Sequence, residues 1–195
     1  MEAIYKDLPI VSFADKQSFY VWLSHNHEIT DKGFWLRYFK KASGKPTITH
    51  DEAVDVALCW GWVDGLTNKY DEESYVIRYT PRRPKSVWSK VNVARVERLI
   101  ASGEMRPSGL MHVHAAKADG RWEAAYAGQS SMQPPQAFMD LLATDPKALA
   151  FYESLNKTNK YAVDYRLAVA VGPEKQAAVR QKMFERMQSG QRYHP

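Results

Sequence analysis

The segment of residues 58–92 constrains the fold more than any other part of the chain. Side chains of different character alternate along Tyr75–Thr80, as on a strand with two unlike faces. One face would carry Tyr75, Ile77 and Tyr79, and the other Val76, Arg78 and Thr80. Pro81 and Pro84 then end the strand and restrict the backbone between them. The sequence therefore predicts a two-faced strand that leads directly into a restricted basic turn.

Helix signals flank this segment on both sides. Asp15 can cap a helix that ends near residues 25–26. Thr49 and Glu52 form a capping box for a helix that Gly61 ends. Further strands are expected over residues 33–39 and 62–65. Further helices are expected over residues 86–103, 107–118, 136–143, 145–155, 156–171 and 174–190.

Residues 127–135 (AGQSSMQPP) separate two regions of different character. Strand and helix patterns are mixed before this linker, and only helix patterns follow it. The sequence therefore predicts the α+β class, with a small mixed sheet and packed helices over residues 1–130. A helical C-terminal segment over residues 131–195 would follow it.

Composition places the chain among ordinary globular proteins and excludes several classes. Of its 195 residues, 45% are hydrophobic and 25% charged. No apolar run approaches the roughly 18 residues of a membrane-spanning helix. The N-terminus carries Glu2 and Asp7 and lacks the apolar stretch of a secretory signal. The single cysteine, Cys59, cannot form an internal disulfide, so a cytoplasmic location is expected.

Positive charge is concentrated in one part of the chain. Between residues 78 and 98 seven basic residues face a single acid, a local charge of +6. The whole chain carries +5, so the remainder sums to about −1. Such local excess favours a patch with an anionic target. The alternative is an exposed basic face that water solvates.

The block Thr80–Asn92 is the strongest candidate for a binding site. Arginine side chains bind phosphate or carboxylate through two parallel hydrogen bonds, and the prolines lower the entropy lost in holding them. Serine and asparagine at a helix start add donors, and tryptophan rings can form flat walls. The candidate ligand-binding residues are Trp62, Asp64, Arg78, Arg82, Arg83, Lys85, Ser86, Trp88, Ser89 and Asn92. The alternative is an internal network of ion pairs that ties the C-terminal helices to the sheet.

Asp64, in the turn WGWVDG, is the only catalytic candidate. It can form the turn, orient Arg78 or Arg82, or act as a general base. The motifs of serine hydrolases, P-loop enzymes, dinucleotide-binding folds and zinc proteases are absent. His112 and His114 would diverge on a helix, so neither a metal site nor a cofactor is predicted. Cys59 is expected to be a buried structural thiol.

Three runs of the sequence resemble a known family. They are GFWLRYFKKASGKPTITHDEAVDVALCWGWVDGL (33–66), IRYTPRRPKSVWSKVNVARVERLIASGEM (77–105) and AFMDLLATDPKALAFYESLNKTNKYAVDYRLAVAV (137–171). They are similar to the YdeI/OmpD-associated proteins of the bacteriocin-protection group. The resemblance implies stress protection and association with an outer-membrane porin, often in the periplasm, without an established reaction. The basic run usual in the family's helical tail is reduced here to residues 170–179 (AVGPEKQAAV).

These observations favour a non-enzymatic stress-protection or binding protein. Its basic and aromatic site would take an anionic small molecule or a protein partner. One alternative is an enzyme acting on a phosphorylated or nucleotide-like substrate with Asp64 as base. A second is a nucleic-acid binder, although no nucleic-acid-binding motif is present. The sequence leaves the oligomeric state open.

Overall fold

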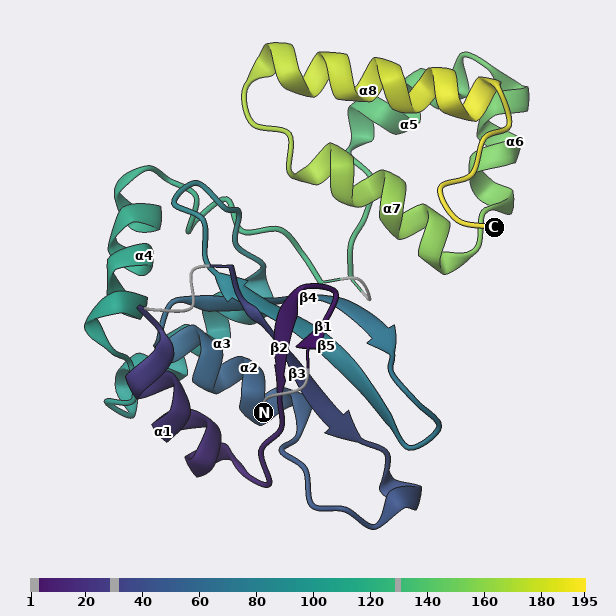
Figure 1. Cartoon of the computed structure of the whole chain (residues 1–195). Helices are drawn as coiled ribbons and strands as arrows, with labels where there is room; N and C mark the ends of the chain where they lie inside the picture. The colour runs from purple at the N-terminus through teal and green to yellow at the C-terminus, as the bar shows by residue number, and fades with distance from the viewer. Residues whose placement is uncertain (1–3, 29–31, 129–130) are drawn as a thin grey trace. The chain divides into compact units, whose positions relative to one another are not determined.

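The computed structural model describes residues 4–28, 32–128 and 131–195, and these form two compact units (Figure 1). The first unit comprises Met1–Trp88 and Asn92–Ala124. The second unit comprises Ser89–Val91 and Ala125–Pro195, so it begins before the boundary that the sequence predicts at residue 131. A mixed sheet and helices are both present, which confirms the predicted α+β class.

The first unit is built on a five-stranded mixed sheet. The strands are β1 (Ile4–Tyr5), β2 (Leu8–Val11), β3 (Phe34–Phe39), β4 (Trp62–Lys69) and β5 (Ser74–Pro81). Their order is β1-β2-β3-β5-β4, and the β2–β3 pair is parallel while the other pairs are antiparallel. The sequence predicts β3, β4 and β5 but not β1 and β2, because these two strands are too short to show a clear alternation.

The main hydrophobic core lies between one face of this sheet and two helices, α1 (Lys16–Asn26) and α2 (His50–Cys59). Ile77 and Tyr79 of β5 point into it, as the alternation predicts, and Phe34 stacks on Tyr79 with ring centroids 5.7 Å apart. The unit also contains the 3-10 helix η1 (Lys41–Ser43), the helix α3 (Lys90–Ala101) from Asn92 onward, and the helix α4 (Pro107–Ala118).

Two expected caps fix the starts of the core helices. The Asp15 carboxylate accepts the backbone N–H of Ser18 at 2.8 Å at the start of α1. At the start of α2, Thr49 and Glu52 each bind the backbone N–H of the other, which confirms the capping box. Each such cap contributes about 1 kcal/mol by satisfying donors that the helix leaves open.

The sheet curls so that its two edge strands approach each other. The Tyr5 ring of β1 contacts Trp35 of β3 at 5.2 Å and Tyr70, just beyond β4, at 5.6 Å between centroids. Lys6 and Asp7 form the β1–β2 turn with φ angles of 47° and 64°, a conformation that L residues rarely adopt. The hairpin therefore lies over the sheet face that α1 and α2 leave uncovered.

The second unit is helical. Its helices are α5 (Gln136–Ala143), α6 (Pro146–Ser154), α7 (Lys157–Ala168) and α8 (Pro173–Gln188), close to the predicted ranges. Asp145 and Asn156 cap α6 and α7 through their side chains. Buried side chains from all four helices form a separate core. Within the part of the chain that the structure describes, no helix is both long and apolar enough to cross a bilayer.

A substitution at Gly33, the residue just before β3, tests how closely the chain at this point must approach β5. A Cβ at this position would lie 2.2 Å from the Tyr79 carbonyl oxygen, and φ is +91°. We expect Gly33→Ala to lower the free energy of unfolding by about 2–4 kcal/mol, because strain and a backbone clash combine. Urea unfolding followed by tryptophan fluorescence measures the change.

Gly44 provides the matched control, because its φ is +67° and a Cβ added there would meet nothing within 4 Å. Gly44→Ala should cost only about 1 kcal/mol, the strain of the left-handed backbone alone. Equal losses in the two variants would contradict the close approach at Gly33.

Candidate functional site

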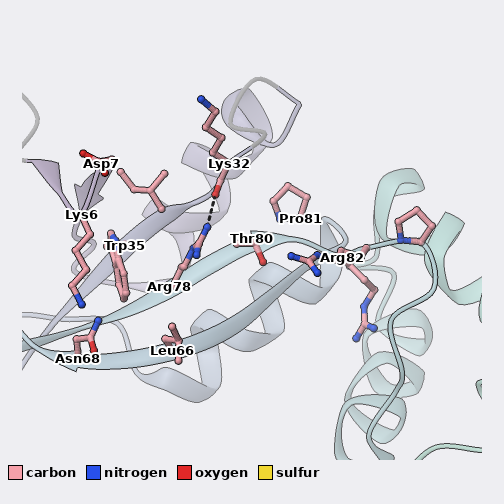
Figure 2. Close-up of a pocket in the computed structure, with 13 residues that line it drawn as sticks. Lys6, Asp7, Lys32, Trp35, Leu66, Asn68, Arg78, Thr80, Pro81 and Arg82 are labelled. Atoms are coloured by element: carbon pink, nitrogen blue, oxygen red, sulfur yellow. Dashed lines mark hydrogen bonds between the residues drawn. The ribbon is translucent and has the colours of Figure 1, made fainter. Parts of the chain in front are cut away.

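An open pocket of about 900 Å³ lies on the sheet face opposite the main core (Figure 2). The β1–β2 turn, Lys32 two residues before β3, and the strands β2, β3, β4 and β5 contribute to its lining. Five basic residues line it, namely Lys6, Lys32, Arg78, Arg82 and Arg83. Asp7 is the one acid among the described residues of the lining, so the pocket is strongly positive.

The register of the strands determines which side chains form the floor of the pocket. Trp35 of β3 lies directly opposite Arg78 of β5, so the two side chains are neighbours on the same face. Thr80 follows Arg78 on that face, and Asn68 reaches it from β4 through its pairing with Val76. The alternation that sends Ile77 and Tyr79 into the core thus sends the basic residue into the pocket.

Four of the five cations of the pocket have no carboxylate partner in the part of the chain that the structure describes. Within the described residues, Lys6, Lys32, Arg78 and Arg83 form no ion pair; Arg78 Nη2 donates instead to the Lys32 carbonyl at 3.3 Å (Figure 2). Arginines elsewhere in the unit do pair with aspartates: Arg37 with Asp71, Arg95 with Asp51 and Asp55, Arg98 with Asp55, and Arg121 with Asp119. The positive charge of the pocket is therefore available to a ligand.

Two buried donors of the pocket floor are also unsatisfied. Trp35 Nε1 and Arg78 Nε are shielded from solvent and have no acceptor among the described residues. Leaving a buried donor unpaired costs about 1–3 kcal/mol. An anion whose oxygens reached this cross-strand pair would recover that free energy.

Arg82 has a structural role that the sequence left open. Its side chain is only 6% exposed, and its guanidinium carbon lies 3.6 Å from the centroid of the Trp88 ring. Nη1 donates to Ser86 Oγ at 2.9 Å and to the Val87 carbonyl at 3.2 Å. Arg82 borders the pocket, but these contacts hold the turn of residues 82–88 in place.

Trp88 and Ser86 belong to the same internal network. Trp88 is 2% exposed and contacts Trp122 edge-on at 4.9 Å, while the Ser86 carbonyl accepts from Arg121 at 2.8 Å. The prediction that Trp88 stacks on a ligand is therefore wrong, because its faces are covered by protein.

Trp62 and Asp64 lie on the opposite side of the sheet from the pocket. Trp62 is 1% exposed in the main core, so the prediction that it forms a wall of the site is wrong. Asp64 pairs across the strands with Tyr79 and forms an ion pair with His50 Nε2 at 3.1 Å. The prediction that it orients Arg78 or Arg82 is wrong, because the sheet separates it from the pocket.

The remaining predicted residues are dispersed. Arg83 and Lys85 are exposed, and only Arg83 lines the pocket. Ser89 belongs to the second unit, where it bridges to Tyr126, and Asn92 lies in the first turn of α3. The structure therefore brings together Arg78, Arg82 and Arg83 from the predicted set.

Sequence reasoning missed several residues of the pocket, among them Lys6, Asp7, Lys32 and Trp35. Alternation along residues 33–39 offered a signal for Trp35, because it places this residue opposite Phe34 and Leu36. No local pattern indicates Lys6 or Asp7, which reach the site only through the curl of the sheet.

Cys59 and possible metal ligands were also among the groups that the sequence singled out. Burial raises the pKa of the Cys59 thiol to about 12, so it stays protonated and unreactive, as expected of a structural thiol. In the described ranges, no three His, Cys, Asp or Glu side chains gather to hold a metal ion.

Two known protein families match different parts of the chain. Residues 11–112, more than half of the chain, match the family described as a domain of unknown function, DUF8412. The chain belongs to the DUF8412 family. The matched stretch of this DUF8412 protein contains both the WGWVDG turn and the basic block.

Residues 131–190 match the family described as "Bacteriocin-protection, YdeI or OmpD-Associated". This match confirms the resemblance over the helical C-terminal residues. No curated protein and no solved structure matches the chain.

Neighbouring arginines provide a test of the structural role of Arg82. Arg82→Ala removes the ring contact and leaves buried acceptors unpaired, so we expect the free energy of unfolding to fall by about 2–4 kcal/mol. Arg83→Ala, at the exposed neighbour, should change it by less than about 0.5 kcal/mol. Guanidinium chloride unfolding measures both. Similar values for the two variants would show that Arg82 is not structural.

The pair His50–Asp64 predicts a measurable pKa change. The hydrogen bond that the His50 imidazole donates to the Asp64 carboxylate raises the pKa of His50. The pair therefore stabilises the fold below the ordinary pKa of histidine, about 6.5, and that stability is lost as pH rises through the raised value. Asp64→Asn should lower the pKa of His50, at a cost in stability below about 1 kcal/mol because both groups are partly exposed.

NMR titration of the imidazole resonances follows the change at His50. A titration midpoint that does not move in Asp64→Asn would mean that the ion pair does not form in solution.

Proposed function

We propose that this DUF8412 protein is a non-enzymatic binding protein whose pocket on the uncovered sheet face takes a small anion. The observation that carries the proposal is a group of cations that have no carboxylate partner among the described residues, namely Lys6, Lys32, Arg78 and Arg83. Unpaired cations repel one another, so an anion that enters among them gains attraction and relieves that repulsion.

The chemistry of the pocket favours an oxyanion such as a phosphate or a carboxylate. Arginine binds either group through paired hydrogen bonds, and the unsatisfied donors of Trp35 and Arg78 add two more. Leu8 and Leu66 also line the pocket and would contact an apolar part of the ligand.

Burial of the tryptophans disfavours a ligand held by base stacking. Trp35 is 3% exposed, and Trp88 lies beneath Arg82, so neither presents an open ring face. Single-stranded nucleic acids are bound largely through such faces. The pocket therefore supports a small anion better than a nucleic acid.

The position of Asp64 weakens the enzyme alternative. A general base must reach the proton that it removes, within about 3 Å or through one water molecule. Asp64 lies on the other sheet face and is bound to His50. The pocket itself offers Asp7 as its one described carboxylate, which supports binding rather than base catalysis.

The match of residues 131–190 supports a protective role as part of this proposal. Proteins of that family are described by bacteriocin protection and by association with OmpD. Binding of an anionic molecule or of a protein partner would serve such a role, in a reducing compartment such as the cytoplasm that suits the single buried thiol Cys59.

Isothermal titration of the full chain with inorganic pyrophosphate, a compact oxyanion, tests the proposal. We expect saturable binding that weakens as salt is raised. Arg78→Ala should reduce affinity at least about tenfold, because it removes a charged donor from the floor of the pocket.

Lys85→Ala is the matched control. It removes one positive charge from the same basic segment but from a residue that does not line the pocket, so affinity should change less than about twofold. Absence of binding, or equal losses in Arg78→Ala and Lys85→Ala, would contradict a site in this pocket.

A further inference from the structure

The helical unit contains a second pocket, of about 860 Å³, which is separate from the anion site. Its walls are largely apolar and aromatic, with Met132, Met139, Tyr152 and Tyr161 among the lining residues. The charged side chains that enter it come mainly from one stripe of α7. Lys157, Lys160 and Asp164 are spaced by about one helical turn each, so they share a face of this helix.

Asp164 is an acid buried in this apolar setting. It is 5% exposed, and the Tyr152 hydroxyl donates to Oδ1 at 2.8 Å. Its second oxygen, Oδ2, accepts no hydrogen bond from the described residues. Burial raises the pKa of Asp164, while the hydrogen bond from Tyr152 and the nearby charge of Lys160 act in the opposite direction. A buried carboxylate of this kind gains most from an ammonium group.

Lys160 lies one turn before Asp164 and does not pair with it. Opposite charges four residues apart on a helix commonly form an ion pair. Here the Lys160 Nζ lies 5.7 Å from the centroid of the Tyr152 ring, and the hydroxyl of the same Tyr152 binds Asp164. Tyr152 thus engages both charged side chains. Lys157 likewise forms no ion pair with a described residue, which leaves two cations beside one buried acid, with the exposed Glu153 as a second acid in the lining.

We propose that this pocket binds a small zwitterion, an α-amino acid with an apolar side chain. The ammonium group would bind Asp164 Oδ2, the carboxylate would bind Lys160 and Lys157, and the side chain would pack on the methionine and tyrosine walls. An α-amino acid carries its two charges about one carbon apart, which suits two opposite charges that are neighbours on a helix but not bonded to each other.

Ligands with a single charge fit the pocket less well. An amine without a carboxylate would meet two lysines that it cannot satisfy, and a carboxylate without an amine would lie beside the buried acid. The unfavourable free energy of leaving a charge unpaired in a site of low polarity exceeds the favourable free energy of a single charged contact. Discrimination against both single-charge analogues is therefore the signature of the proposed site.

Isothermal titration of the full chain with matched probes tests the proposal. One series is L-phenylalanine, phenethylamine and 3-phenylpropanoate; the other is L-leucine, isopentylamine and 4-methylpentanoate. At least one of the two amino acids should bind saturably and at least about tenfold more tightly than its own amine and acid analogues. No binding of either amino acid, or equal binding of an amine or acid analogue, would overturn the proposal.

Isosteric variants locate the site. Asp164→Asn keeps an acceptor for Tyr152 but removes the charge, and should weaken amino-acid binding at least about tenfold. If Asp164→Asn does not fold, Lys160→Gln, at a less buried position, decides: weaker binding supports the site, and unchanged binding overturns it. Arg78→Ala, in the other unit, should leave amino-acid binding unchanged, which separates this test from that of the anion pocket.

Discussion

The alternation of side chains along β5 determines which residues of the first unit can meet. β5 is paired with β3 on one edge and with β4 on the other, which fixes its register. In this register Ile77 and Tyr79 pack into the core, and Arg78 faces the pocket on the other side of the sheet. A slip of one residue would bury Arg78 without a partner and expose two core side chains, at a cost of several kcal/mol. The charged floor of the pocket is therefore held in register by the packing of the core behind it.

The basic segment that follows β5 is divided between two tasks. Arg82 packs inward on Trp88 and holds the turn, whereas Arg83, the next residue, is exposed beside the pocket. Pro81 and Pro84 bracket this pair and limit the conformations that it can adopt. Charge that is continuous in the sequence is thus partly structural and partly available for binding. Two further cations line the pocket, Lys6 from the β1–β2 turn and Lys32 from the segment before β3.

Local signals predicted the parts of the molecule that depend on local interactions. The caps at Asp15 and Thr49 and the faces of β5 follow from short-range patterns, and the structure has all of them. The site depends instead on long-range pairing. Trp62 carries no local mark of burial, and Lys6 reaches the pocket only because the sheet curls until Tyr5 meets Tyr70. Such contacts between distant residues are decided by the whole fold, so the sequence identified the basic segment but not its partners.

The most direct test of the anion pocket is an NMR titration of the full chain with pyrophosphate, read at the backbone amides and at the indole N–H groups. We predict saturable shifts centred on Trp35 and Arg78, including the Trp35 indole N–H, with smaller shifts at the β1–β2 turn. Assignment of that indole resonance follows from its disappearance in Trp35→Phe. Shifts confined to residues 85–92, with Trp35 and Arg78 unmoved, would contradict a site in this pocket and return the binding role to the basic segment alone.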